Sequence, residues 1–295
     1  MDSLNRTLAG TFLPGNKKQS MAELNARAEM PCPLPSQAAI DHIWLDVRDA
    51  ATDVAMREVV LQARMQRLVL DRTSLADVIA EVLSDRLISA DICQPSLYSL
   101  ISEVIDDEKI ILQHIAADLH ALKSRDPACL NYLHGLLNMK GFHALETYRI
   151  AHSLWLRNRK ELAFALSNKA SAVFCVDIHP AARIGSGVML DHGSGIVIGE
   201  TAVVDDNVSM LQNVTLGGTG KERGNRHPKV RCGVMIGVGA KILGNIEIGT
   251  MSKIGAGSVV LEEVPPHCTV AGVPARIVRR HHPVLDMDQS VEGIG

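Results

Sequence analysis

Branched aliphatic residues recur at every sixth position through the second half of the chain. Twelve of these thirteen positions hold Val, Ile or Leu: Ile178, Ile184, Leu190, Ile196, Ala202, Val208, Val214, Val230, Ile236, Ile242, Ile248, Ile254 and Val260. A helix or an ordinary alternating strand would not keep an interval of six. Short parallel strands wound around a triangular prism would, because each strand sends one branched side chain into the interior. The period therefore predicts a parallel β-helix over residues 174–264.

The preceding residues, 37–173, follow a helical period instead. Ile101, Val104 and Ile105 recur at the spacing of one helix face. Asp126 stands before Pro127 and is expected to end a helix. A long helical segment is expected from Gly141 onward. The fold class predicted is α+β, with an all-α N-terminal domain followed by the β-helix. Residues 1–36 are expected to be a flexible leader and 265–295 a C-terminal segment and tail.

The six-residue repeat is interrupted once, between Val214 and Val230. These positions are sixteen residues apart, which is ten more than the repeat requires. The extra residues, in a loop over 217–229, are rich in glycine and basic side chains. Insertions in a solenoid form loops, and functional groups gather on such loops. The loop is therefore a candidate for ligand contacts, and a tolerated surface insertion is the alternative.

Composition excludes several classes of protein. The chain has 30 basic and 33 acidic residues and no long basic run, which argues against nucleic acid as a partner. No apolar run is long enough to span a membrane, and the N-terminus does not read as a secretory signal. The six cysteines are widely spaced, as in a reduced cytoplasmic protein rather than a zinc or disulfide framework.

Several motifs resemble those of the hexapeptide-repeat serine O-acetyltransferases. The segments that carry the resemblance are Ser124–Ala128, Lys140–Leu145, Asp177–Pro180, Asp191–His192, Thr215–Lys221, Arg226–Lys229 and Ala271–Arg276. The resemblance implies a left-handed β-helix and transfer of the acetyl group of acetyl-CoA to the hydroxyl of L-serine. The products would be O-acetyl-L-serine and CoA, in the first step of cysteine biosynthesis.

The chemistry requires a base, because an alcohol is scarcely ionised at neutral pH, and histidine suits this role. The resemblance assigns the base to His192 and its carboxylate partner to Asp177. Serine is a zwitterion and needs anions and cations around it. The resemblance assigns its ammonium to Asp126 and Asp191, and its carboxylate to two residues of the loop, Arg226 and His227.

Acetyl-CoA is the expected co-substrate, lying along the solenoid, and no metal is expected. The residues expected to bind it are Gly218, Gly239, Lys253, Ala256 and Arg276. The resemblance favours direct attack by serine on the thioester, and none of the cysteines stands in a motif that would argue for an acyl-enzyme.

The resemblance also implies a homotrimer that pairs into a hexamer. The family's C-terminal isoleucine enters O-acetylserine sulfhydrylase, but here Gly295 follows Ile294. An alternative activity is acetylation of a sugar or another small-molecule hydroxyl. A zinc hydratase would need His179, His192 and His227 on one metal, and their spacing lacks the close pair of such a site. A non-enzymatic scaffold is the remaining alternative.

Overall fold

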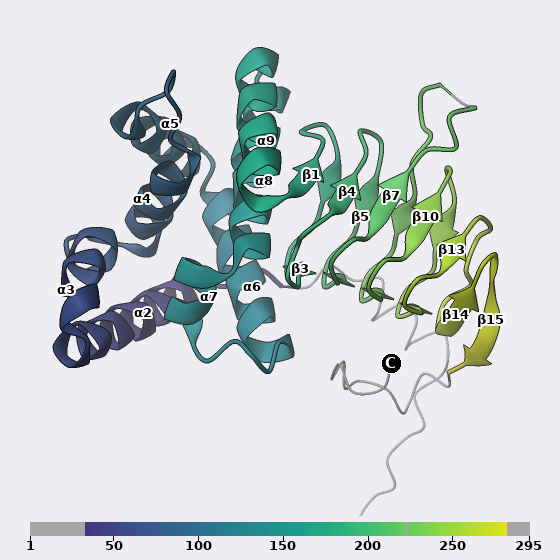
Figure 1. Ribbon diagram of the computed structural model, residues 1–295, viewed down its shortest axis with the longest axis horizontal. Coiled ribbons are helices and arrows are strands. Elements are labelled where there is room, and N and C mark those ends of the chain that lie inside the picture. Colours follow the sequence, from purple (N-terminus) through teal and green to yellow (C-terminus); the bar gives the residue numbers. More distant parts are fainter. Residues whose placement is uncertain (1–32, 222, 282–295) are drawn as a thin grey trace, which may run out of the picture.

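The computed structural model describes residues 33–221 and 223–281. Helices occupy one end of the molecule, and a solenoid of short strands extends from them (Figure 1). The predicted α+β class, with a helical part before a parallel β-helix, is confirmed. The expectations placed on residues 1–32 and on the tail, 282–295, lie outside the described residues. Within the described part, no helix is both long and apolar enough to cross a membrane.

The helical part contains eight α-helices and one π-helical turn within the described residues. They are α2 (Gln37–Arg57), α3 (Val59–Met65), η1 (Gln66–Leu70), α4 (Leu75–Leu87), α5 (Gln94–Asp107), α6 (Lys109–Arg125), α7 (Tyr132–Asn138), α8 (Lys140–Leu156) and α9 (Lys160–Phe174). Ser36, Ser74 and Asn131 cap three helices by accepting a backbone N–H at the first turn. As predicted, α6 ends at the residue before Asp126.

The expectation of one continuous helical segment from Gly141 onward is wrong. The chain forms α8 and α9, two helices that pack against each other and are joined by a short turn. Asn158 in this turn has φ of 59°, a left-handed conformation that asparagine tolerates better than most residues. The apolar stripe continues through both helices, so periodicity alone did not reveal the break.

The solenoid has three faces, named here by their sheets. Face A holds β1 (Val176–Ile178), β4 (Ile196–Ile198), β7 (Thr215–Gly217), β10 (Lys241–Leu243) and β13 (Val259–Val260). Face B holds β2 (Arg183–Ile184), β5 (Val203–Val204), β8 (Lys229–Val230) and β11 (Glu247–Ile248). Face C holds β3 (Met189–Leu190), β6 (Ser209–Met210), β9 (Met235–Ile236), β12 (Lys253–Ile254), β14 (Cys268–Gly272) and β15 (Ala275–Arg280). All pairings are parallel except that of β14 with β15.

The strict interval of six is wrong at one place in the first coil. Ile178 stacks on Ile198, twenty residues on, and Ile198 stacks on Leu216, eighteen residues on. Two extra residues therefore lie between β3 and β4. Ile196 and every sixth residue after it up to Val214 are buried. They form a second interior row of side chains and do not continue the row that begins with Ile178. The extra residues are His192 and Gly193, which directly follow Asp191.

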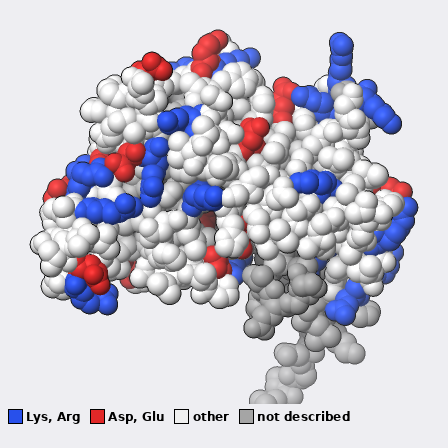
Figure 2. Space-filling view, viewed as in Figure 1, with Lys and Arg blue, Asp and Glu red and all other residues white. Residues whose placement is uncertain are grey.

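The loop between β7 and β8 holds fewer extra residues than expected. Thr215 pairs with Lys241, twenty-six residues on, so the excess over an eighteen-residue coil is eight rather than ten. The loop projects from the edge between faces A and B, and basic side chains stand at its tip (Figures 1 and 2). The sequence places Lys221 and Arg223 there.

A buried group of charged side chains joins the helices to the first coil. Arg149 of α8 donates to Asp118 of α6 over 2.7 Å and to the Gly185 carbonyl over 2.7 Å. The other carboxylate oxygen of Asp118 accepts from the backbone N–H of Val188 over 2.8 Å. Glu146 of α8, also buried, lies 3.4 Å from Arg149. The middle of α6 and the middle of α8 are thereby held against the first coil.

Candidate active site

A small cavity of about 210 Å³ lies where α6, α7 and α8 meet the first coil. Its lining includes Asp126, Lys140, Asp191 and His192, together with residues of α7 and β3. Three of the residues assigned from the sequence, namely Asp126, Asp191 and His192, therefore line one cavity. It stands at the edge between faces C and A, called here the C–A edge.

Asp126 reaches the cavity because the end of α6 is fixed on the solenoid. The neighbouring Arg125 donates to the carbonyls of Gly187 and Asn207 over 3.0 and 3.1 Å. Asp126 follows as the C-terminal cap, and one of its oxygens accepts from the Ala128 N–H over 2.8 Å. Its carboxylate is thus positioned by the anchored Arg125 before it and by the hydrogen bond from Ala128 after it.

His192 lies in the turn that contains the two extra residues. Its φ is 55°, in the left-handed region, and its side chain is 72% exposed. The imidazole Nε2 lies 3.8 Å from Asp191. Burial raises the pKa of Asp191 above its ordinary value, His192 opposes this, and Asp126 adds to it. Two carboxylates that repel each other in one cavity favour a cationic ligand.

Asp177 lies on β1 of face A, and His192 lies in the turn at the C–A edge that borders this face. Val176, its neighbour, is close to Gly193, since a Cβ at Gly193 would lie 3.1 Å from the Val176 side chain. Asp177 follows Val176 in the chain and His192 precedes Gly193, so each is one residue away from this contact. Among the described residues, no hydrogen bond or ion pair joins their side chains. The predicted pairing of the two stays a prediction.

Arg226 and His227 lie at a different edge, between faces A and B, called here the A–B edge. Arg226 forms a 2.7 Å ion pair with Glu200, which lowers the pKa of that carboxyl. His227 is buried, and its Nδ1 lies 2.8 Å from the Thr201 hydroxyl. Burial lowers the pKa of His227, and Arg226 lowers it further. The protomer does not bring these two residues to His192.

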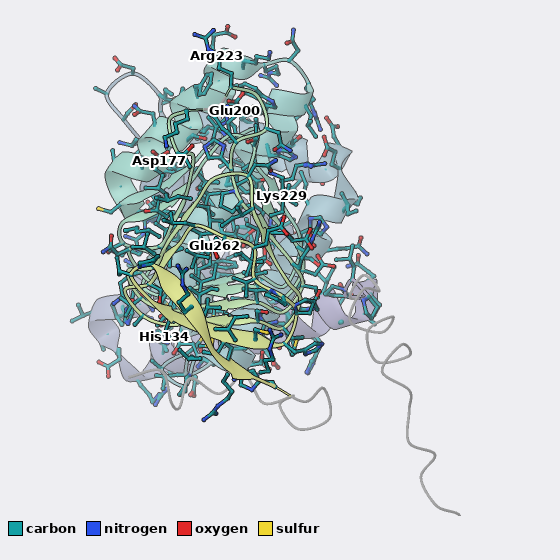
Figure 3. All side chains as sticks on the ribbon, turned by 90° about the vertical axis from the view of Figure 1, so that its right-hand side faces the viewer. His134, Asp177, Glu200, Arg223, Lys229 and Glu262 are labelled. Atoms are coloured by element: carbon teal, nitrogen blue, oxygen red, sulfur yellow. The ribbon has the colours of Figure 1, made fainter. Side chains whose placement is uncertain are left out.

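Figure 3 looks along the solenoid and shows the separation of its sides. Asp177 lies on one side and Lys229 on the other, with Arg223 near the top at the projecting loop. Glu200, the partner of Arg226, also lies toward that end of the view. The A–B edge is thus a second cluster of assigned residues, one face away from the first.

Two of the five residues expected to bind CoA continue the His192 edge. Successive turns are joined there by backbone hydrogen bonds, from Asn213 to Ser194, from Gly239 to Gln212 and from Gly257 to Val238. Ala256 stands beside Gly257 in the last of these turns.

The other three residues expected to bind CoA lie elsewhere. Lys253 lies on face C in β12. Gly218 lies beside Arg226 at the loop, where a Cβ would be 3.5 Å from that side chain. Arg276, on β15, is exposed and 3.7 Å from Glu262. The protomer therefore aligns only part of the expected set.

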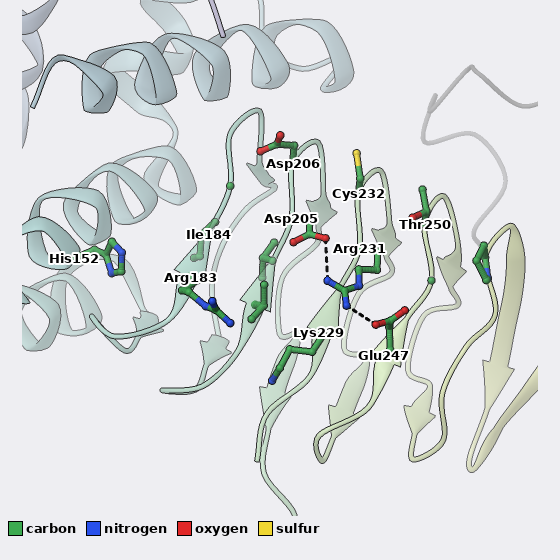
Figure 4. Close-up of a pocket in the computed structure, with 15 residues that line it drawn as sticks. His152, Arg183, Ile184, Asp205, Asp206, Lys229, Arg231, Cys232, Glu247 and Thr250 are labelled. Carbon is green, nitrogen blue, oxygen red and sulfur yellow. Dashed lines mark hydrogen bonds and ion pairs between the residues drawn. The ribbon is translucent and has the colours of Figure 1, made fainter. Parts of the chain in front are cut away.

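A larger hollow lies elsewhere in the described residues. It encloses about 1050 Å³ on face B, between α8 and the coils (Figure 4). Three of its charges pair with one another, since Arg231 lies between Asp205, at 3.5 Å, and Glu247, at 2.5 Å. None of the residues assigned from the sequence lines it. The smaller cavity is the better candidate because its carboxylates and imidazole converge.

Sequence analysis assigned no role to three residues that support these sites. Lys140 belongs to one of the quoted motifs, and its ammonium donates to Ser194 in the His192 turn. Glu200 and Thr201 hold Arg226 and His227, although no motif marked them. Within residues 33–221 and 223–281, no group of three or more His, Cys, Asp or Glu side chains is arranged to hold a metal ion.

The β-helix, with a histidine and two carboxylates at one edge, defines an acyltransferase of the hexapeptide-repeat class. Residues 43–147 match the family model described as serine acetyltransferase, N-terminal. The serine acetyltransferase of Salmonella typhimurium is 48% identical over 268 residues, which cover 90% of this chain and 96% of that protein. The chain belongs to the serine acetyltransferase family, as its motifs predicted.

Solved structures agree with this assignment. Soybean serine acetyltransferase complexed with serine has a TM-score of 0.81 and 46% identity, covering 82% of this chain and 100% of that one. The Brucella abortus serine acetyltransferase in complex with coenzyme A has a TM-score of 0.82 and 45% identity, covering 84% and 99%. The predicted fold and family are thus confirmed together.

Proposed function

We propose that this chain transfers the acetyl group of acetyl-CoA to the hydroxyl of L-serine, giving O-acetyl-L-serine and CoA. This is the first step of cysteine biosynthesis from serine. The observation that carries the proposal is the convergence of Asp126, Asp191 and His192 in one cavity of a serine acetyltransferase family member. Relatives solved with serine and with coenzyme A support both substrates.

His192 is the general base in this proposal. Its imidazole takes the hydroxyl proton as the serine oxygen attacks the thioester carbonyl carbon, and a tetrahedral intermediate forms. The C–S bond then breaks, and the imidazolium returns the proton to the departing sulfur. Asp177 would stabilise the imidazolium and hold its tautomer. The exposed position of the imidazole leaves it open to both substrates.

The serine zwitterion needs residues from both edges. Asp126 and Asp191 would bind its ammonium, while Arg226 and His227 would bind its carboxylate. One protomer holds these pairs on different edges of the prism, so a single copy offers half a site. We propose a homotrimer in which the C–A edge of one protomer meets the A–B edge of the next. Face A, where Val197 is 38% exposed, would then lie toward the threefold axis.

Acetyl-CoA would lie along the C–A edge, beside the turns that contain Gly239 and Ala256. Its thioester would reach His192 at the first turn. Lys253 on face C would also contact the cofactor. Gly218 and Arg276 remain proposed contacts, with Gly218 supplied from the facing A–B edge. The pantetheine arm is long enough to follow successive coils, which are spaced by about 4.8 Å.

Further features complete the proposal. The proposed domain organisation is a leader over 1–36, a helical domain over 37–173, the β-helix over 174–264 with its loop at 217–229, and a C-terminal segment over 265–295. Two trimers would pair through the helical domains into a hexamer. The C-terminal segment would bind O-acetylserine sulfhydrylase. The enzyme would act in the cytoplasm.

Thiol release from acetyl-CoA should depend on L-serine. The assay measures free CoA thiol with the wild-type chain alone, with L-serine and with a galactoside in its place. We expect release to rise with L-serine and to stay at the background level with the galactoside, because only an amino acid offers the ammonium that Asp126 and Asp191 bind. Faster release with the galactoside would favour the alternative, acetylation of a sugar hydroxyl.

A further inference from the structure

The beginning of α8 lies against the turn that carries His192. A Cβ added to Gly141 would overlap the carbonyl oxygen of Leu190, just before the turn. A Cβ at Gly193, just after His192, would lie 3.0 Å from the Gly141 Cα. The helix therefore touches the turn on both sides of the imidazole, and no side chain larger than hydrogen fits at either glycine without a shift.

Lys140, the first residue of α8, adds a polar contact at the same place. Its ammonium donates to the hydroxyl of Ser194. The backbone of Ser194 closes the turn, since its N–H donates to the His192 carbonyl over 2.9 Å. Its carbonyl accepts from Asn213 of the next coil over 2.7 Å. Ser194 thus links Lys140, the His192 turn and the second coil.

The imidazole itself has few restraints within the protomer. Its imidazole Nε2 lies 3.8 Å from Asp191, and that distance is longer than a hydrogen bond. The orientation of the ring is therefore set by the backbone of the turn. The left-handed φ of His192 is costly for a residue other than glycine, and it persists because surrounding contacts hold it.

We infer that Lys140 is a positioning residue for His192, acting through the hydroxyl of Ser194. This inference rests on the proposed role of His192 as general base. The ammonium holds the turn in its left-handed form and also places a positive charge in the cavity with the imidazole. The charged groups that line the cavity with the imidazole are Asp126 after α6, Lys140 from α8 and Asp191 from the turn, and Asp177 of β1 is the proposed partner.

Three variants separate the hydrogen bond from the charge. Lys140→Met removes both, Ser194→Ala removes only the acceptor, and Lys140→Arg keeps a charged donor. We expect Lys140→Met and Ser194→Ala each to lower kcat by about 10- to 100-fold, the scale of a small misplacement of a reacting group. Lys140→Arg should recover most of the loss. The KM for acetyl-CoA should not change.

The pH profile distinguishes positioning from loss of structure. Removing the cation in Lys140→Met favours the imidazolium, so the acidic limb of kcat/KM should move to higher pH. Ser194→Ala retains the cation and should keep the wild-type limb. The double variant should lose no more kcat than the worse single variant, because both remove one hydrogen bond. Lys109→Met, at the first position of α6, is the matched control and should behave as wild type.

The outcomes are separable from failure of the proposed function. If wild-type protein releases no serine-dependent thiol, or a His192 variant keeps full activity, the proposed function fails. If those tests succeed and folded Ser194→Ala has wild-type kcat, the positioning role is contradicted. Additive losses in the double variant would contradict it as well. Unfolding temperatures of all variants show whether Lys140→Met folds, and Ser194→Ala carries the test if it does not.

Discussion

Replacement of His192 by asparagine is expected to lower kcat by roughly 10²- to 10⁴-fold, the usual contribution of a general base. Asparagine is preferred to alanine because it tolerates the left-handed φ of 55° at this position. The side chain is mostly exposed, so the unfolding temperature should barely change. The measurement is serine-dependent thiol release at saturating substrates, with the unfolding temperature of each variant recorded.

The matched control is His42→Asn on α2, an exposed histidine far along the chain from the cavity. It should leave kcat unchanged. Full activity in His192→Asn would show that another group takes the hydroxyl proton. An equal loss in His42→Asn would point to a general effect of the substitution rather than to catalysis.

Replacement of Arg149 by methionine is expected to reduce the free energy of unfolding by about 3–5 kcal/mol. Its guanidinium is in contact with two buried carboxylates, Asp118 and Glu146. Removing one partner of a buried ion pair leaves an uncompensated charge, and this cost exceeds the worth of the pair itself. The hydrogen bond to Gly185 is lost as well. Urea unfolding at a fixed protein concentration measures the difference.

Glu146→Gln is the control, and the two carboxylates should respond differently. Burial raises the pKa of Glu146 well above its ordinary value, and Asp118 adds to this. Burial therefore favours the protonated form of Glu146, and glutamine is close to that form in shape and charge. Asp118, whose pKa burial raises to about 6, is the ionised partner of Arg149. Glu146→Gln should thus cost far less than Arg149→Met.

The sign of the pH effect follows from the raised pKa of Glu146. The stabilising contribution of its protonated form is complete below the ordinary carboxyl pKa and is lost as pH rises through the raised value. Glutamine cannot ionise, so the variant should gain stability relative to wild type at alkaline pH. A constant difference between the two proteins from pH 5 to pH 9 would contradict the protonated state of Glu146.

The repeat was visible in the sequence because each coil buries aliphatic side chains at fixed places. Its one shift was not visible, since Ile196 is as suitable for the second interior position as for the first. The two extra residues carry no special composition that would reveal them. Their position at His192 and Gly193 emerged only from the pairing of successive coils.

The residue types of the site were predictable from the sequence. Their distribution over two edges of the solenoid was not. Motifs pointed to Asp126 and His192, which lie in one cavity, and to Arg226, which lies at the other edge. A linear sequence does not show which edge a turn occupies when the coil length varies. The contact of Lys140 with Ser194 joins two segments 54 residues apart, and only folding brings them together.

The most direct test of a serine site shared between protomers uses two inactive variants, His192→Asn and Arg226→Met. Each alone should form little O-acetyl-L-serine, because each lacks one half of every site. In trimers co-assembled from equal amounts, a site is intact when a protomer with His192 faces a neighbour with Arg226, so activity should return to about a quarter of wild type. No recovery in co-assembled trimers, or a fully active monomer, would contradict the shared site.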